Sequence, residues 1–353
     1  MRLYNFFKNK KVLVTGHTGF KGSWLVTWLN ILGCKVMGIS LNPVKGDNHF
    51  RILKKDLNII DKRGDIRNEK YIKEIIKQFK PDIVFHLAAQ AIVSTSYSHP
   101  KLTFETNVLG TLNLLTVLAE LKHKCIAILV TSDKCYKNIE VTRGYTETDE
   151  LGGDDFYSSS KASAELIINS FYKSFIKNKN TLLRISTARA GNVVGGGDWS
   201  KNRLIPDCVK SWSKNQTVIL RNPNSTRPWQ HVMEALSGYL HLAYKLDRDK
   251  ELNGESFNFS NSEIKNFTVL KFIKGIKKYW KNARWKVYKK SSFYESTLLQ
   301  LNSNKAKKVL NWENKLKLSE TIKLVGEWYT AYYESNKKKI LTKEQIIFYM
   351  RKK

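Results

Sequence analysis

A serine, a tyrosine and a lysine near the middle of the chain form a set that can remove a proton from a hydroxyl group. Tyr157 and Lys161 are spaced Y-x-x-x-K, which places both on one face of a helix. A nearby ammonium group favours the tyrosinate form, so the tyrosine becomes a base. Ser132 follows the apolar run Ile126–Thr131, which predicts a strand with the serine at its carboxyl end.

Further polar residues adjoin this set. Asp133 and Lys134 follow Ser132 directly, and Asn107 lies upstream in the segment TNVLGT. A Y-x-x-x-K pattern alone is often a surface pair, but the serine and the glycine loop described next make the combination specific. We therefore take as candidate catalytic residues Ser132, Asp133, Lys134, Tyr157, Lys161 and Asn107.

The N-terminal segment contains a candidate dinucleotide-binding loop. The strand predicted at Lys11–Thr15 runs directly into GHTGFKG, whose glycines are spaced G-x-x-G-x-x-G. In such a loop Gly16 makes the tight turn, Gly19 lets the backbone approach a pyrophosphate, and Gly22 lets the helix pack closely on the sheet. The helix then directs its N-terminal amides at the phosphates. Lys21 adds a cation there, the alternative being a solvated lysine of the first turn.

The remaining cofactor contacts are predicted from their places after strands. An acidic residue that holds the adenosine ribose is expected at the end of the second strand, but Ser40 stands there. A serine can still bond a ribose hydroxyl, no arginine is expected beside it to favour a 2′-phosphate, and Lys45 is the nearest base, so the sequence favours NAD over NADP. The other expected contacts are His17 and Phe20 in the loop, Asp65 and Ile66 at the adenine, and Leu87, Ala88 and Ala89 at the nicotinamide.

The elements that must position these residues alternate between strand and helix. Apolar runs predict buried parallel strands at Lys11–Thr15, Lys35–Ser40, Asp82–Leu87, Ile126–Thr131 and Thr181–Ser186. The stretches between them predict helices at Phe20–Leu32, from about Asn68, at Leu102–Leu121 and at Ser158–Phe175. This rhythm indicates an α/β fold, a doubly wound parallel sheet of the Rossmann type, over residues 1–187. Residues 188–353 are expected to form mainly a smaller substrate-binding lobe, with part of 232–262 returning to the first domain.

Composition narrows the functional class. The 353 residues are 42% hydrophobic, which suffices for a buried core, and the absence of an 18-residue apolar run predicts no membrane span. The scattered cysteines and the lack of a secretory signal predict a cytoplasmic protein with neither disulfides nor a metal site. The net charge of +30 is spread along the chain without a nucleic-acid-binding motif, so no nucleic-acid partner is expected. A basic, nucleic-acid-associated protein on this fold stays as an alternative.

The glycine loop, Asn107, Ser132, Tyr157 and Lys161 together resemble the extended short-chain dehydrogenase/reductases over roughly residues 10 to 335. The segment TSDKCY at Thr131–Tyr136 is similar to the dehydratase branch, where an acid–base pair follows the hydroxyl residue. The Asp-Lys pair and the segments GHTGFKGSW, AGNVVGGGDW and RNPNSTRPWQHV resemble the dehydratases that act on CDP-glucose. The resemblance implies CDP-glucose as substrate, NAD as cofactor, and a homodimer formed through helices near 102–121 and 158–175.

The same resemblance implies a mechanism. Tyr157 would take the proton from O4 of the sugar, with Ser132 hydrogen-bonded to it, while hydride leaves C4 for NAD. A base would then remove the C5 proton, Asp133 would protonate the departing 6-hydroxyl, and hydride would return to C6. Lys134 stands where related enzymes carry a glutamate base, and would act either as a neutral base or as a cation that stabilises the enolate. The product would feed the synthesis of 3,6-dideoxyhexoses for a surface polysaccharide.

The nucleotide end of the substrate is expected in the second lobe. Asn192 resembles a position that contacts the diphosphate, and His231 is a further candidate on the nucleotide side. Arg203, Arg221 and Arg227 are candidate phosphate clamps because a guanidinium binds phosphate in a bidentate manner; the alternative is that each lies on the surface. Rival activities are a sugar-nucleotide 4-epimerase and a dehydratase of another nucleotide sugar.

Overall fold

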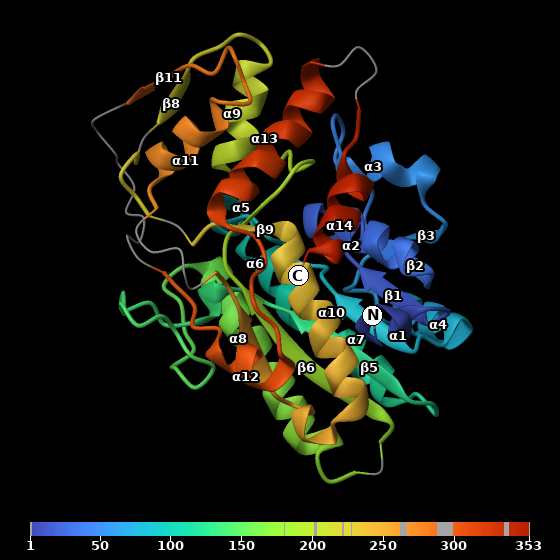
Figure 1. The fold of residues 1–353 in the computed structure, drawn as a ribbon. Helices are drawn as coiled ribbons and strands as arrows, with labels where there is room; N and C mark the ends of the chain where they lie inside the picture. Colours follow the sequence, from blue (N-terminus) through green and yellow to red (C-terminus); the bar gives the residue numbers. More distant parts are fainter. Residues whose placement is uncertain are drawn as a thin grey trace.

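The central element is a seven-stranded sheet in the order β10-β6-β5-β4-β1-β2-β3, in which every neighbouring pair is parallel. The structure is a computed structural model that describes residues 2–179, 181–200, 203–220, 222–226, 228–261, 267–287, 299–334 and 339–352. The strands are β1 (Lys11–Thr15), β2 (Lys35–Ser40), β3 (Ile59–Arg63), β4 (Ile83–His86), β5 (Cys125–Val130), β6 (Leu183–Ala190) and β10 (Ser256–Phe259). This arrangement confirms the doubly wound parallel sheet (Figure 1).

Helices cover both faces of the sheet because successive strand residues point to opposite sides. Leu13 joins the core under α4 (Glu69–Phe79), α7 (Gly110–Ala119) and α8 (Phe156–Phe171). Val12 and Val14 join the core on the other face, under α2 (Phe20–Ile31), α10 (Val232–Arg248) and α14 (Thr342–Arg351). Both faces are thus buried, which explains why the strands read as continuous apolar runs.

The predicted helix at Leu102–Leu121 is a composite of three parts. It consists of α6 (Pro100–Phe104), a π-helical turn η2 (Glu105–Leu109) and α7. By length and composition alone, Pro100–Ala119 could cross a membrane, and half of its apolar 18-residue window is buried inside the protein. The helix predicted at Ser158–Phe175 is α8 followed by a second π-helical turn, η4 (Tyr172–Ile176). Shorter helices are α1 (Arg2–Phe7), α3 (His49–Leu53) and α5 (Val93–Ser98).

Most elements after β6 gather on one side of the sheet (Figure 1). They comprise α9 (Leu204–Trp212), α11 (Val269–Ile276), α13 (Leu318–Glu334), and the two-stranded pairs β8 (Val218–Leu220) with β11 (Trp285–Val287) and β7 (Val193–Val194) with β9 (Gln230–His231). In contrast, α10 packs on β5 and β6, β10 pairs with β6, and α12 (Asn304–Leu310) packs on β10. Strand β6 crosses residue 187, and the domain division there stays a prediction.

Candidate active site

The candidate residues follow strands that run in the same direction, so they meet at one edge of the sheet. The glycine loop follows β1, Leu87 follows β4, Ser132 follows β5 and Asn192 follows β6. The carboxyl ends of neighbouring parallel strands lie side by side, and open sheets of this type bind ligands at that edge. The strand order β6-β5-β4-β1 therefore brings these segments together.

The structure joins Ser132, Asp133 and Tyr157. Ser132 caps the one-turn helix η3 (Asp133–Cys135): its hydroxyl accepts a hydrogen bond from the Lys134 amide at 3.2 Å and donates one to the Asp133 carboxylate at 2.8 Å. Ser132 also lies close enough to Tyr157 for a side-chain interaction that lowers the pKa of the tyrosine. Helix α8 begins under a cap from Asp155, which accepts the Ser158 amide at 2.9 Å, and this start places Tyr157 in the first turn.

Burial changes the proton affinity of the catalytic groups. Desolvation raises the pKa of Tyr157 to about 12, an effect that the interaction with Ser132 opposes. Desolvation lowers the pKa of Lys161 to about 8, while the negative charge of Glu165 acts in the opposite direction. Burial also raises the pKa of Asp133, against the charge of Lys134. A carboxyl group with a raised pKa is better suited to donate a proton, as the role of Asp133 requires.

The two remaining candidate catalytic residues, Lys134 and Asn107, lie in different surroundings. Lys134 is only partly buried and projects from η3 beside Asp133. Asn107 lies in the π-helical turn η2, where its side chain accepts the Gln90 amide at 2.8 Å and donates to the Ser160 hydroxyl at 2.9 Å. Asn107 thus connects the loop after β4 to α8, and short π-helical turns are frequent at functional sites.

The glycine loop has the geometry of a cofactor cradle. Gly16 has φ +74°, and a side chain there would collide with the Ala88 amide at 2.7 Å. A side chain at Gly22 would lie 2.2 Å from the Gly16 carbonyl, because the helix packs directly against the turn. Gly19 is exposed and directly precedes α2. A Cβ atom added at Gly19 would lie near the Gly16 carbonyl oxygen, at 3.3 Å. The protein therefore leaves Gly19 open to a ligand, as a bound pyrophosphate requires.

His17 and Ser40 have neighbours that the sequence did not reveal. His17 is fully buried over Gly38, and its Nε2 bonds Asp61 at 2.9 Å, so its ring turns into the protein. Ser40 bonds the Thr18 hydroxyl at 2.7 Å. Arg63 of β3 lies opposite Ser40 in the sheet, so the expectation that no arginine stands beside Ser40 holds along the chain but is wrong in space. Asp61 already binds that arginine at 2.8 Å.

The other predicted cofactor residues lie along the same edge of the sheet and differ in burial and in the partners that they already bind. Asp65 is held by the Arg67 guanidinium at 2.7 Å, and Ile66 is buried against Gly110. Phe20 opens α2, and its ring packs near Gly195. Leu87, Ala88 and Ala89 are partly buried after β4.

Lys21 belongs to the site, although its sequence context also allowed a solvated lysine. It is partly buried and donates to the Tyr239 hydroxyl at 3.3 Å. Desolvation lowers its pKa to about 8, with the positive charge of Arg203 in the same direction and Asp133 opposing it. The sequence signal for this placement is that Lys21 directly precedes Gly22, the glycine that packs against the Gly16 turn.

The predicted nucleotide-side residues do not form one group. Arg203 precedes α9, binds the Asp198 carboxylate at 3.0 Å, and lies near enough to influence both Lys21 and Tyr157. Asn192 is exposed before β7. His231 is fully buried and its Nδ1 accepts the Met233 amide as the cap of α10, so its contact with the nucleotide stays a prediction. Arg221 and Arg227 lie outside the described residues.

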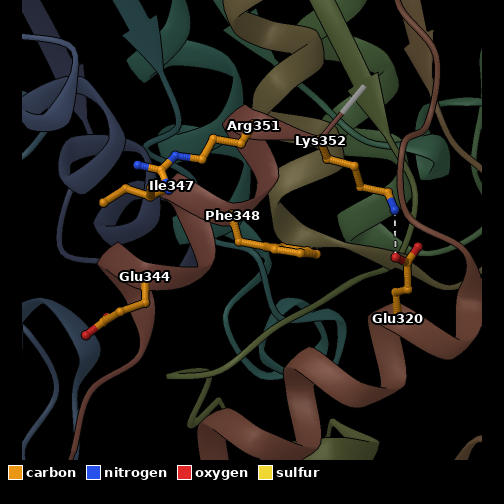
Figure 2. Close-up of a pocket in the computed structure, with 6 residues that line it drawn as sticks. All are labelled: Glu320, Glu344, Ile347, Phe348, Arg351 and Lys352. Carbon is orange, nitrogen blue, oxygen red and sulfur yellow. Dashed lines mark hydrogen bonds and ion pairs between the residues drawn. The ribbon is translucent and has the colours of Figure 1, made fainter.

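One surface hollow is separate from this chemistry. It measures about 550 Å³ and is lined by Glu320, Glu344, Ile347, Phe348, Arg351 and Lys352 (Figure 2). Lys352 closes one side through its 2.6 Å bond to Glu320. Because none of the candidate catalytic residues lines it, we place the active site at the sheet edge by its proton-transfer groups. Among the described residues, no group of histidines, cysteines and carboxylates is arranged to hold a metal ion.

Comparisons with known proteins agree with this geometry. Residues 13–325 match the family described as GDP-mannose 4,6 dehydratase. The chain is 40% identical over 350 residues to a CDP-glucose 4,6-dehydratase from Salmonella typhimurium, covering 98% of each chain. A UDP-glucose 4-epimerase from Thermotoga maritima, solved with UDP-glucose, has a TM-score of 0.77 and 25% identity, covering 90% of this chain and 98% of that one. A dTDP-glucose 4,6-dehydratase from Bacillus anthracis in complex with NAD has a TM-score of 0.76 and 22% identity, covering 92% and 98%. The chain therefore belongs to the GDP-mannose 4,6-dehydratase family.

Proposed function

We propose that the chain converts CDP-glucose to CDP-4-dehydro-6-deoxyglucose and water, with NAD as its bound cofactor. The observation that carries the proposal is the buried Asp133 carboxyl group, which accepts a hydrogen bond from the Ser132 hydroxyl beside Tyr157 and Lys161. A simple dehydrogenase or an epimerase needs the last three groups but no additional proton donor. The CDP moiety is supported by the 40% identity to the Salmonella enzyme.

NAD fits the residues at the sheet edge. The open Gly19 backbone and the N-terminal amides of α2 would hold the pyrophosphate, and Ser40 would bond the adenosine ribose. Asp65 and Ile66 would adjoin the adenine, and Leu87, Ala88 and Ala89 the nicotinamide. When bound, NAD supplies hydride transfer chemistry at C4 and C6 of the sugar.

The chain's own groups would move the protons. Tyr157 removes the proton from O4. Burial raises its pKa, contrary to the shift expected from a nearby ammonium group, and the interaction with Ser132 and the charge of Arg203 oppose that rise. Loss of the C5 proton is favoured by the adjacent 4-ketone, and Lys134 is placed beside Asp133 either to take that proton or to stabilise the enolate. Asp133 gives its proton to the leaving 6-hydroxyl, which departs as water. The product is completed when hydride returns to C6 and a proton returns to C5. Asn192 and Arg203, together with Arg221 and Arg227, would bind the diphosphate.

We further propose a cytoplasmic homodimer that acts in the synthesis of dideoxysugars for a surface polysaccharide. The helices expected at the dimer interface present exposed apolar side chains, among them Leu109 and Leu166. The π-helical turn η2, which carries Leu109, and helix α7 both pack against α8, which carries Leu166.

A nucleotide specificity assay tests the proposed reaction. The purified protein is incubated with NAD and with CDP-, UDP- or dTDP-glucose, and the 4-keto product is followed by its alkaline absorbance. The largest kcat/KM is expected with CDP-glucose. A larger kcat/KM with dTDP-glucose would overturn the nucleotide assignment, and an unaltered or 4-epimerised sugar would overturn the dehydratase assignment.

A further inference from the structure

A buried ion pair lies directly behind the candidate catalytic turn. The Glu165 carboxylate of α8 and the Arg189 guanidinium of β6 are 2.8 Å apart, and their side chains are only 2% and 4% exposed. Removing two charges from water costs several kcal/mol per ion, so a buried pair is weak evidence for stability and calls for another explanation. Thr187 also donates to Glu165, at 3.1 Å.

The ion pair is bonded to the residues on both sides of the catalytic turn. Thr131, which precedes Ser132, donates its hydroxyl to the Glu165 carboxylate at 2.5 Å. Tyr136, which follows Cys135, accepts a hydrogen bond from Arg189 at 2.7 Å and lies under its guanidinium. The segment that carries Ser132, Asp133 and Lys134 is therefore fixed at both ends by one pair of charges.

The same pair also reaches the catalytic helix. Glu165 lies one turn after Lys161, which itself lies one turn after Tyr157, so all three point to the same side of α8. All three side chains are buried. The negative charge of Glu165 favours the protonated form of Lys161. Glu165 thus touches the turn through Thr131 and influences the lysine through its charge.

We infer that Glu165 and Arg189 are positioning residues that hold the Ser132–Cys135 turn in register with Tyr157 and Lys161. The inference rests on the proposed function, and it assigns the two charges no contact with substrate or cofactor. Their effect is exerted through Thr131 and Tyr136. A displacement of about 1 Å in a catalytic group can cost about 100-fold in rate, which is the physical reason to retain a costly buried pair.

The test alters the two connections and leaves the charges in place, because removing either charge leaves the other buried and unpaired. Thr131→Val and Tyr136→Phe each delete one hydroxyl, and each is expected to lower kcat about tenfold or more with KM for the nucleotide sugar little changed. Thr131→Ser keeps the hydroxyl and should restore most of kcat. Thr187→Val, the matched control, deletes a hydroxyl that binds Glu165 but is remote in sequence from the turn, and should stay within twofold of the wild type.

Hydrogen exchange provides a readout that does not depend on the identity of the reaction. Amides of residues 131–136 should exchange faster in Thr131→Val and Tyr136→Phe than in the wild type and in Thr187→Val. Equal exchange in all four proteins, or kcat values of the two variants within twofold of Thr187→Val, would overturn the inference. If the wild type does not dehydrate CDP-glucose, the proposed function fails, while the exchange comparison still decides whether the ion pair holds the turn.

Discussion

At the scale of single residues, Asp133 separates this site from one that only oxidises an alcohol. Its carboxyl group is buried, and it accepts a hydrogen bond from Ser132 at 2.8 Å. Asp133→Asn keeps the size of the side chain but removes the proton, so we expect dehydration to slow by about 100-fold or more. NAD affinity should be unchanged, because the residue lies outside the glycine loop.

Rapid-quench analysis of product formation, together with an NAD titration, measures both effects. The exposed Asp154 provides a control, and Asp154→Asn should behave as the wild type. Near-normal turnover of Asp133→Asn would remove Asp133 from the mechanism.

Gly19 tests the cofactor loop without a large perturbation of the fold. A methyl group at Gly19 would meet only the Gly16 carbonyl, at 3.3 Å, whereas one at Gly22 would lie 2.2 Å from that carbonyl. Gly19→Ala should therefore melt close to the wild type but lose at least tenfold in NAD affinity, since the methyl group would occupy the position of the pyrophosphate. Gly22→Ala should lower the melting temperature instead. Fluorescence titration with NAD and NADP measures the affinities, and tighter binding of NADP by the wild type would contradict the cofactor assignment.

The sequence identified the residues whose position is set by local pattern. Ser132, Tyr157 and the glycines were predictable because strand ends and helical spacing determine where they lie. Arg63 and Glu165 were not, because their roles depend on neighbours far apart in the chain: Arg63 faces Ser40 across the sheet, and Glu165 meets Arg189 of β6. His231 stays a prediction on the nucleotide side, and its role as the N-cap of α10 was not predicted because an N-cap deep in the core has no distinct sequence signal.

At the scale of elements, the same distinction explains which strands were predicted. β1, β2, β4 and β5 are mostly apolar runs buried on both faces, and their alternation with helices indicated a parallel sheet but not the order of its strands. The strand predicted at Thr181–Ser186 covered only the first half of β6, because Thr187 and Arg189 interrupt the apolar pattern although both are buried. β3 is an edge strand in which three of the five residues of IIDKR are charged and none is fully buried, so its pattern did not predict a strand. The π-helical turns were also unpredicted, because they are short and rare and lie within longer helices that the apolar pattern indicates as a whole.

Helix α14 is attached to α10 through a buried acid. Glu234 accepts hydrogen bonds from the amides of Lys315 and Leu316 at 2.9 and 2.6 Å, and from the Tyr349 hydroxyl at 2.6 Å. Burial raises its pKa to about 7, from 4.5. Between these values the folded protein binds more protons than the unfolded chain, so the stability that Glu234 contributes is lost as pH rises from about 4.5 to 7.

Glu234→Gln removes this titration. The melting temperature of the variant should therefore fall less between pH 5 and pH 8 than that of the wild type, since each pKa unit corresponds to about 1.4 kcal/mol. Glu344→Gln replaces an exposed acid on α14, the helix that Glu234 of α10 binds through Tyr349, and this variant should keep the wild-type dependence on pH. Identical pH dependence in all three proteins would show that Glu234 is not protonated on folding.

At the scale of the whole molecule, α8 has two functions in the proposed assembly. Its inner face carries Tyr157 and Lys161, while Leu166 is 54% exposed on its outer surface. If this surface forms the dimer, Leu166→Asp should shift sedimentation toward the monomer, because a carboxylate would be buried at the interface. Ile219→Asp on β8, where Ile219 is 61% exposed, should not change the assembly. A monomeric wild type would contradict the proposed dimer.

The fate of the hydrogen at C4 tests the central claim most directly. One site that holds Ser132, Tyr157 and Lys161 next to Asp133 can oxidise C4, eliminate water and complete the reduction of C6 without releasing an intermediate. With CDP-glucose deuterated at C4, we predict that the label appears at C6 of the product and that solvent deuterium enters at C5. Stoichiometric release of reduced cofactor carrying the label would contradict the account, as would label retained at C4 with inverted configuration.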